Sequence, residues 1–131
     1  MPDTAGARFA QARQPCIAIV AIMFPYDSAL LAAVRTPPQS VPDVIRILEA
    51  IAAICADGDG LKWFNWLYLQ VTQAVKTRVD AHGFADPAWI AELDVQFARM
   101  YFGALRSALA GEPYAGCWKA LFESRSQAPV A

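Results

Sequence analysis

Histidine and cysteine are scarce in this chain of 131 residues, and each scarcity excludes a class of site. His82 is the only histidine, so the chain alone offers no multi-histidine metal site. The three cysteines, Cys16, Cys55 and Cys117, are far apart and form no C-x-x-C pair, which argues against a zinc knuckle or a redox dithiol. We interpret the three cysteines as reduced. A disulfide bond between two of them is the alternative if the protein is exported. The sequence predicts neither a bound metal nor a cofactor.

Charge is also scarce, at 18% of residues, and the 11 basic and 12 acidic side chains leave a net charge of -1. This balance lacks the basic surface that binds nucleic acid or anionic lipid, so we expect no nucleic acid and no membrane among the partners. The sequence has no G-x-S-x-G turn and no glycine-rich phosphate loop, the signatures of common hydrolases and nucleotide-binding proteins. Apolar residues, at 56%, are abundant and predict a packed core.

The N-terminal part of the chain contains an apolar run, Cys16–Phe24, preceded by Arg8 and Arg13. This arrangement loosely resembles a signal peptide, but no small-residue cleavage site follows it. The run is also much shorter than the roughly 20 residues that span a bilayer. We expect a short buried strand or helix here and a cytoplasmic protein. We assign residues 1–38 to an N-terminal apolar segment and linker, and residues 39–131 to a helical bundle domain.

The rest of the chain shows helical periodicity between clear start and stop signals. The first of the expected helices begins directly after Ser40, the N-cap of an S-x-x-D pattern, and the second begins after an N-cap at Asp59. The third has Asp86 as its N-cap and Pro87 as its first residue, and the fourth follows Pro113. They end before Asp57, near Ala81 and near Gly111, and a shorter fourth helix carries Trp118 and Phe122. No strand alternation interrupts this series. The sequence therefore predicts an all-α fold, an antiparallel bundle of four or five helices.

Polar residues recur at helical spacing within the apolar faces of the two longest predicted helices. The set comprises Asn65, Tyr68 and Thr72 in one helix and Asp94 and Tyr101 in the next. If these helices pack antiparallel, Asn65, Tyr68 and Asp94 meet inside the bundle. Because a buried polar group without a partner costs roughly 1–3 kcal/mol, such residues either hydrogen-bond one another or bind a ligand. We name all five as candidate ligand-binding residues, with a structural network as the alternative; an ion pair between Arg99 and Asp94 would favour the network.

Three motifs stand out in the second half of the chain: F-N-x-x-Y-L-x-V-T at residues 64–72, L-D-V-x-F-A-x-x-Y at residues 93–101, and W-x-x-L-F at residues 118–122. Together they resemble a bacterial all-helical family catalogued only as a domain of unknown function. The resemblance extends from about Pro42 to Phe122. It implies a helical fold and brings no established activity with it.

The resemblance also implies a segment beyond these motifs. Members of such a family continue into a helix with a pattern like N-A-H-I-N-H-D-L, which is typical of metal or catalytic equipment. Residues Ser124–Ala131 resemble the connector before that helix. The resemblance thus implies a chain truncated before its histidine-bearing helix, with Asn65, Tyr68 and Asp94 facing the missing segment.

Two classes of function follow from these observations. The favoured prediction is a binding or assembly module that pairs through apolar surface with another copy of the chain or with a second polypeptide, anchored by Trp63 or Trp66. A small-molecule ligand at the polar residues stays open. The alternative is part of a metal-dependent hydrolase-like enzyme, with Asp94 beside an ion whose ligands lie outside this chain. We favour the first because these residues assemble no complete catalytic constellation, and we name no catalytic residue.

Overall fold

The computed structural model describes residues 24–126, and the regular elements of this part of the chain are all helical, with five α-helices and no strand. The α-helices are α2 (Asp27–Ala33), α3 (Val41–Ile54), α4 (Leu61–Asp80), α5 (Pro87–Leu109) and α6 (Lys119–Glu123), and short 3-10 turns cover Gly116–Trp118 and Ser124–Ser126. The predicted all-α class is confirmed. No described helix has both the length and the apolar character that a membrane crossing requires. The apolar run Cys16–Phe24 lies outside the described residues except for Phe24 itself.

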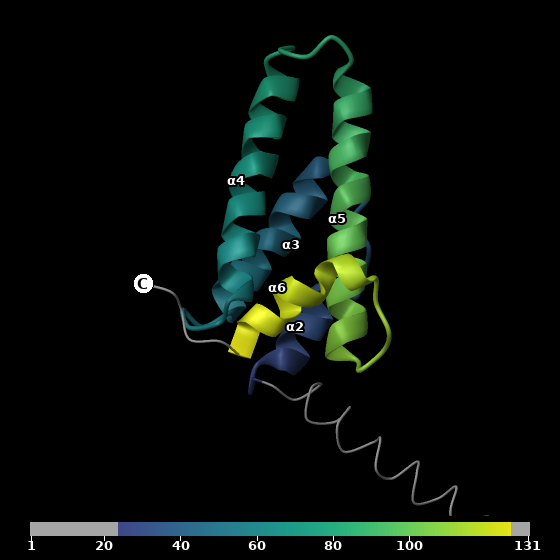
Figure 1. The fold of residues 1–131 in the computed structure, drawn as a ribbon. Helices are drawn as coiled ribbons and strands as arrows, with labels where there is room; N and C mark the ends of the chain where they lie inside the picture. The colour runs from purple at the N-terminus through teal and green to yellow at the C-terminus, as the bar shows by residue number, and fades with distance from the viewer. Residues whose placement is uncertain (1–23, 127–131) are drawn as a thin grey trace, which may run out of the picture.

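The two long helices, α4 and α5, form the frame of the molecule (Figure 1). They run antiparallel, joined by a short loop at residues 81–86. Helix α3 packs against both of them, and α2 packs against α3 and α5. The short α6 lies across the end of the frame far from the loop and contacts α4 (Figure 1).

Local capping signals place the starts of α3 and α5 as the sequence predicts. The Ser40 hydroxyl accepts the N–H of Asp43 at 3.3 Å, and the Asp86 carboxylate accepts the N–H of Trp89 at 3.0 Å. A proline occupies the first turn of each helix, where no intrahelical amide bond is lost. These two predicted boundaries are confirmed.

The start of α4 differs from the prediction in one detail. The N-cap residue is Gly60, and Asp59 lies one position further out, although its carboxylate still accepts the N–H of Leu61 at 2.9 Å. Gly60 is required by packing, because a Cβ there would clash with the backbone carbonyl of Ser124. The close approach of the C-terminal turn to the start of α4 therefore depends on this glycine.

The core lies between α2, α3, α4 and α5. Leu30 and Val34, in and directly after α2, are fully buried together with Leu48 and Ile51 of α3 and Leu105 of α5. Residues ahead of the linker thus contribute to the same core as the bundle helices. The predicted domain division at residue 38 stays a prediction.

Candidate functional site

The predicted polar residues form two separate hydrogen-bonded groups. In the first, the Asn65 amide nitrogen donates to the Leu48 carbonyl at 2.8 Å, and its amide oxygen accepts from the Tyr101 hydroxyl at 3.1 Å. Asn65 and Tyr101 are fully buried, and burial raises the pKa of Tyr101 well above its usual range. This group joins α4 to α3 and α5, and Asn65 makes no hydrogen bond to Asp94. The geometry favours the structural alternative for these two residues.

The second group joins α4 to α5 through Asp94. The Tyr68 hydroxyl lies 2.8 Å from the main-chain oxygen of Asp94 and 3.3 Å from its Oδ1, to which the Thr72 hydroxyl also donates at 3.3 Å. Asp94 is 8% exposed, and its Oδ2 is buried without a hydrogen-bond partner among the described residues. Burial raises the pKa of the Asp94 carboxyl, an effect that the bonds from Tyr68 and Thr72 oppose. This group is therefore incompletely satisfied.

The ion pair between Arg99 and Asp94 that would favour a structural network does not form. Arg99 donates instead from Nε to the carbonyl of Pro38 in the linker, at 2.8 Å. Five residues along an α-helix correspond to a rotation of about 500°, so the two side chains leave α5 in different directions. No cation among the described residues forms an ion pair with Asp94.

Large apolar side chains are exposed on either side of Tyr68 and Asp94. We call this surface the α4–α5 face, and it consists of Leu67, Val71, Leu93, Phe97 and Met100. Their exposure runs from 41% for Phe97 to 59% for Met100. The rings of Tyr68 and Phe97 meet edge to face with centroids 5.0 Å apart, and the Trp118 ring centroid lies 6.0 Å from that of Phe97. The face thus borders the buried carboxylate of Asp94.

The tryptophans predicted as anchors lie near the start of α4. Trp63 and Trp66 are 69% and 50% exposed, and their rings meet edge to face with centroids 5.9 Å apart. They line a shallow pocket of about 290 Å³ together with Asp57 and Lys62. Since Trp63 precedes Leu67 by one helical turn, it extends the α4–α5 face toward this end of the molecule.

A buried ionic cluster that the sequence did not predict lies where the C-terminal turn meets α2 and α4. Arg125 Nη2 lies 2.8 Å from Asp27 Oδ1 and 2.8 Å from Asp59 Oδ2, and its Nε lies 3.1 Å from both oxygens of Asp59. The Tyr26 hydroxyl donates to Asp59 at 2.8 Å, and the guanidinium carbon lies 4.6 Å from the Phe24 ring centroid. All three charged side chains are almost completely buried.

The charged groups of this cluster bind one another and leave no reactive group free. Burial alone would lower the pKa of Arg125, but the bonds to Asp59 and Asp27 outweigh it and raise the pKa. The neighbouring Cys55 is buried, and burial together with the charge of Asp59 raises the pKa of its thiol to about 12. A thiol with this pKa stays protonated at neutral pH and is a poor nucleophile. No local pattern could predict the cluster, because Arg125 is 98 residues from Asp27 and 66 from Asp59.

Metal-binding residues do not gather in the described part of the chain, where no three histidine, cysteine or acidic side chains are placed to hold an ion. His82 lies just beyond the end of α4, in the left-handed region with a φ of 57°. The turn that reverses the chain toward α5 uses this conformation.

Comparison with known families gives one result. A model described as "Family of unknown function (DUF5995)" matches residues 41–131, so the chain belongs to that family. The match confirms the resemblance found in the three motifs. Neither the comparison with curated proteins nor the comparison with solved structures gives a significant match.

Proposed function

We propose that this member of a family of unknown function is a binding module, whose α4–α5 face binds an amphipathic helix of a second polypeptide. In this proposal the bound helix covers the exposed apolar side chains and donates a hydrogen bond to Asp94 Oδ2. The observation that carries the proposal is the position of a buried, unpartnered carboxylate oxygen beside an exposed apolar surface.

The apolar part of the argument rests on how the exposed side chains are arranged. Leu67 and Val71 are one turn apart on α4, and Leu93, Phe97 and Met100 recur at four- and three-residue spacing on α5. Two antiparallel helices with neighbouring exposed apolar rows offer a surface on which the apolar side of a third helix can pack. Contiguous exposed apolar surface of this kind is typical of protein interaction sites.

The polar part of the argument rests on Asp94. Tyr68 and Thr72 both approach Oδ1, so Oδ2 is left without a donor although it is buried. A hydrogen bond to a charged group contributes roughly 1.5–3 kcal/mol, which corresponds to about a tenfold to hundredfold change in affinity. A partner helix with one amide or hydroxyl in its apolar stripe would gain this contribution.

The same oxygen argues for a second polypeptide in preference to another copy of the chain. In a symmetric dimer, each α4–α5 face would cover the other, and none of its five residues carries a hydrogen-bond donor. Asp94 Oδ2 would then stay unpartnered in both copies. A different helix that carries a donor avoids this penalty.

The test uses two synthetic amphipathic helical peptides that differ at one position. The first carries a leucine stripe with a single asparagine at its centre, and the second carries leucine at that position. We expect the protein to bind the asparagine peptide at least about tenfold more tightly, as measured by fluorescence anisotropy. In Asp94→Ala this preference should disappear, whereas Glu92→Ala, which removes an exposed carboxylate on the same helix, should retain it.

The position of the peptide is tested separately. Leu93→Glu should abolish binding of both peptides, and Gln73→Glu, which adds a carboxylate on another side of α4, should not. Light scattering on the protein alone gives the remaining outcome. A dimer that Leu93→Glu dissociates would mean that a second copy occupies the face. That result, equal affinity for the two peptides or binding of neither would each overturn the proposal.

A further inference from the structure

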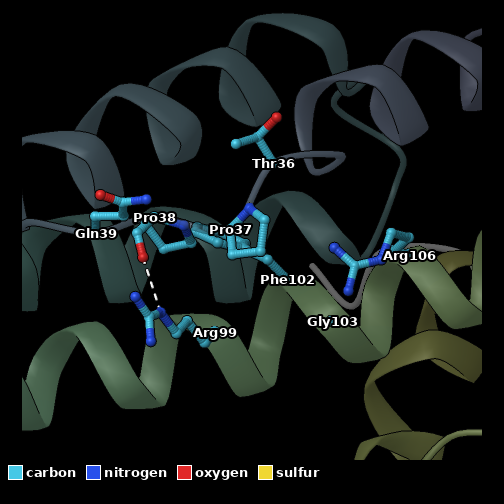
Figure 2. A pocket seen from close by; sticks show the side chains of 8 residues that line it. All are labelled: Thr36, Pro37, Pro38, Gln39, Arg99, Phe102, Gly103 and Arg106. Atoms are coloured by element: carbon cyan, nitrogen blue, oxygen red, sulfur yellow. Dashed lines mark hydrogen bonds between the residues drawn. The ribbon is translucent and has the colours of Figure 1, made fainter.

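A pocket of about 440 Å³ lies between α5 and the linker that joins α2 to α3. Linker residues 36–39 form one wall, and Arg99, Phe102, Gly103 and Arg106 form the other. Figure 2 shows both arginine side chains reaching from α5 toward the linker, with Pro37 and Pro38 above the stretch of helix that separates them. The pocket is independent of the α4–α5 face, since Arg99 is two residues beyond Phe97 and thus rotated by about 200° around the helix.

The linker holds both guanidinium groups in place. Arg99 donates from Nε to the Pro38 carbonyl at 2.8 Å, and Arg106 donates from Nη1 to the Val34 carbonyl at 3.0 Å. A guanidinium has five N–H donors, so several on each arginine are left over after these bonds. Anchoring of this kind reduces the entropy lost when a ligand binds.

The charges in the pocket are unbalanced. Neither Arg99 nor Arg106 forms an ion pair with any carboxylate of residues 24–126, and no acidic side chain lines the pocket. The two arginines are seven residues apart on one face of α5, which separates their α-carbons by about 10 Å along the helix axis. The pocket therefore presents two cationic groups, one toward each end.

Gly103 lies between the two arginines, and packing does not explain it. A Cβ at this position would meet only Arg106 Nη2, at an ordinary contact distance of 3.8 Å. Glycine inside a helix is nonetheless unfavourable compared with alanine. The missing side chain leaves the floor of the pocket open at its centre.

From this geometry we infer that the pocket binds a small organic dianion, with one anionic group on Arg99 and the other on Arg106. The anionic groups are carboxylates or phosphates, which match the planar donor arrangement of a guanidinium. The body of the ligand lies over Gly103, beside the linker wall of the pocket.

The probe is suberate, a dicarboxylate of eight carbons. The references are octanoate and inorganic phosphate, each of which has only one anionic group. We expect titration calorimetry on the full chain to show suberate binding at least tenfold more tightly than either reference. Arg99→Gln and Arg106→Gln should each weaken suberate binding at least tenfold. Arg78→Gln, which removes an arginine near the far end of α4, should not affect it.

Gly103→Ala separates a binding role from a structural one. Alanine favours the helix and meets no close neighbour, so the melting temperature should stay the same or rise, while suberate binding weakens. Equal affinity for suberate and octanoate, no measurable binding of suberate, or binding that survives the double substitution of Arg99 and Arg106 would each overturn the inference.

Discussion

Asp94 shows how one residue can be predicted and still be misread. Its spacing with Tyr101 placed it on an inward face, and the structure confirms that it is buried beside Tyr68 and Thr72. The sequence suggested Arg99 as its partner, but Arg99 bonds to the linker carbonyl of Pro38. Spacing along a helix predicts which residues share a face, but the partners of a long side chain depend on which segment packs beside it.

The raised pKa of Asp94 predicts how its contribution to stability changes with pH. Burial raises the pKa in the folded protein above the unfolded value, so the stability of the wild type falls as pH rises through the folded pKa. Asp94→Asn keeps an oxygen acceptor for Tyr68 and Thr72 but cannot ionise. We therefore expect the free energy of unfolding of the variant, minus that of the wild type, to increase between pH 4 and pH 7. Urea unfolding at several pH values measures this difference, and a constant difference would contradict the prediction.

At the scale of elements, Asn65 links three helices. It bonds to the Leu48 carbonyl of α3 and to Tyr101 of α5 while it belongs to α4, so it fixes how these helices align. The sequence placed Asn65 on a buried face but paired it with Asp94. The spacing within α4 was informative, whereas the identity of the facing residue depended on how α3 packs against α4.

Replacement of Asn65 tests this link. Asn65→Ala leaves the buried Tyr101 hydroxyl without its acceptor, so we expect the free energy of unfolding to fall by roughly 1–3 kcal/mol. If the loss comes from that hydroxyl, Asn65→Ala should cost less in a Tyr101→Phe background than in the wild type. Denaturant titration of the wild type, the two single variants and the double variant measures the free energy of unfolding of each. Equal costs of Asn65→Ala in both backgrounds would mean that the hydrogen bond contributes nothing measurable.

At the scale of the whole molecule, the Arg125 cluster connects the two ends of the described chain. Arg125 lies just after α6, Asp27 begins α2, and Asp59 precedes α4. A buried ion pair is not necessarily more stable than an apolar packing, but removal of one partner leaves charges buried without compensation. Attachment of the C-terminal turn to α2 and α4 therefore depends on all three charged side chains.

We expect Arg125→Ala to lower the free energy of unfolding by about 3–5 kcal/mol, a large fraction of the stability of an ordinary domain. The matched control is Asp57→Ala, which removes an exposed carboxylate that pairs with Lys62 at 2.9 Å. Because solvent screens such surface pairs, the control should change stability very little. Thermal and urea unfolding measure the stability of both variants. Similar effects of the two substitutions would show that the cluster does not stabilise the fold.

The sequence alone determined the helical class, the starts of α3 and α5, and the burial of Asn65, Tyr68, Thr72, Asp94 and Tyr101. These features depend on interactions between residues within a few positions of one another, such as caps and apolar periodicity. Tertiary structure decided which polar residues meet, which apolar side chains stay exposed on α4 and α5, and how Arg125 reaches Asp27 and Asp59. These features depend on contacts between residues far apart in the chain. The spacing of residues along one helix does not specify which residues of another segment pack against it.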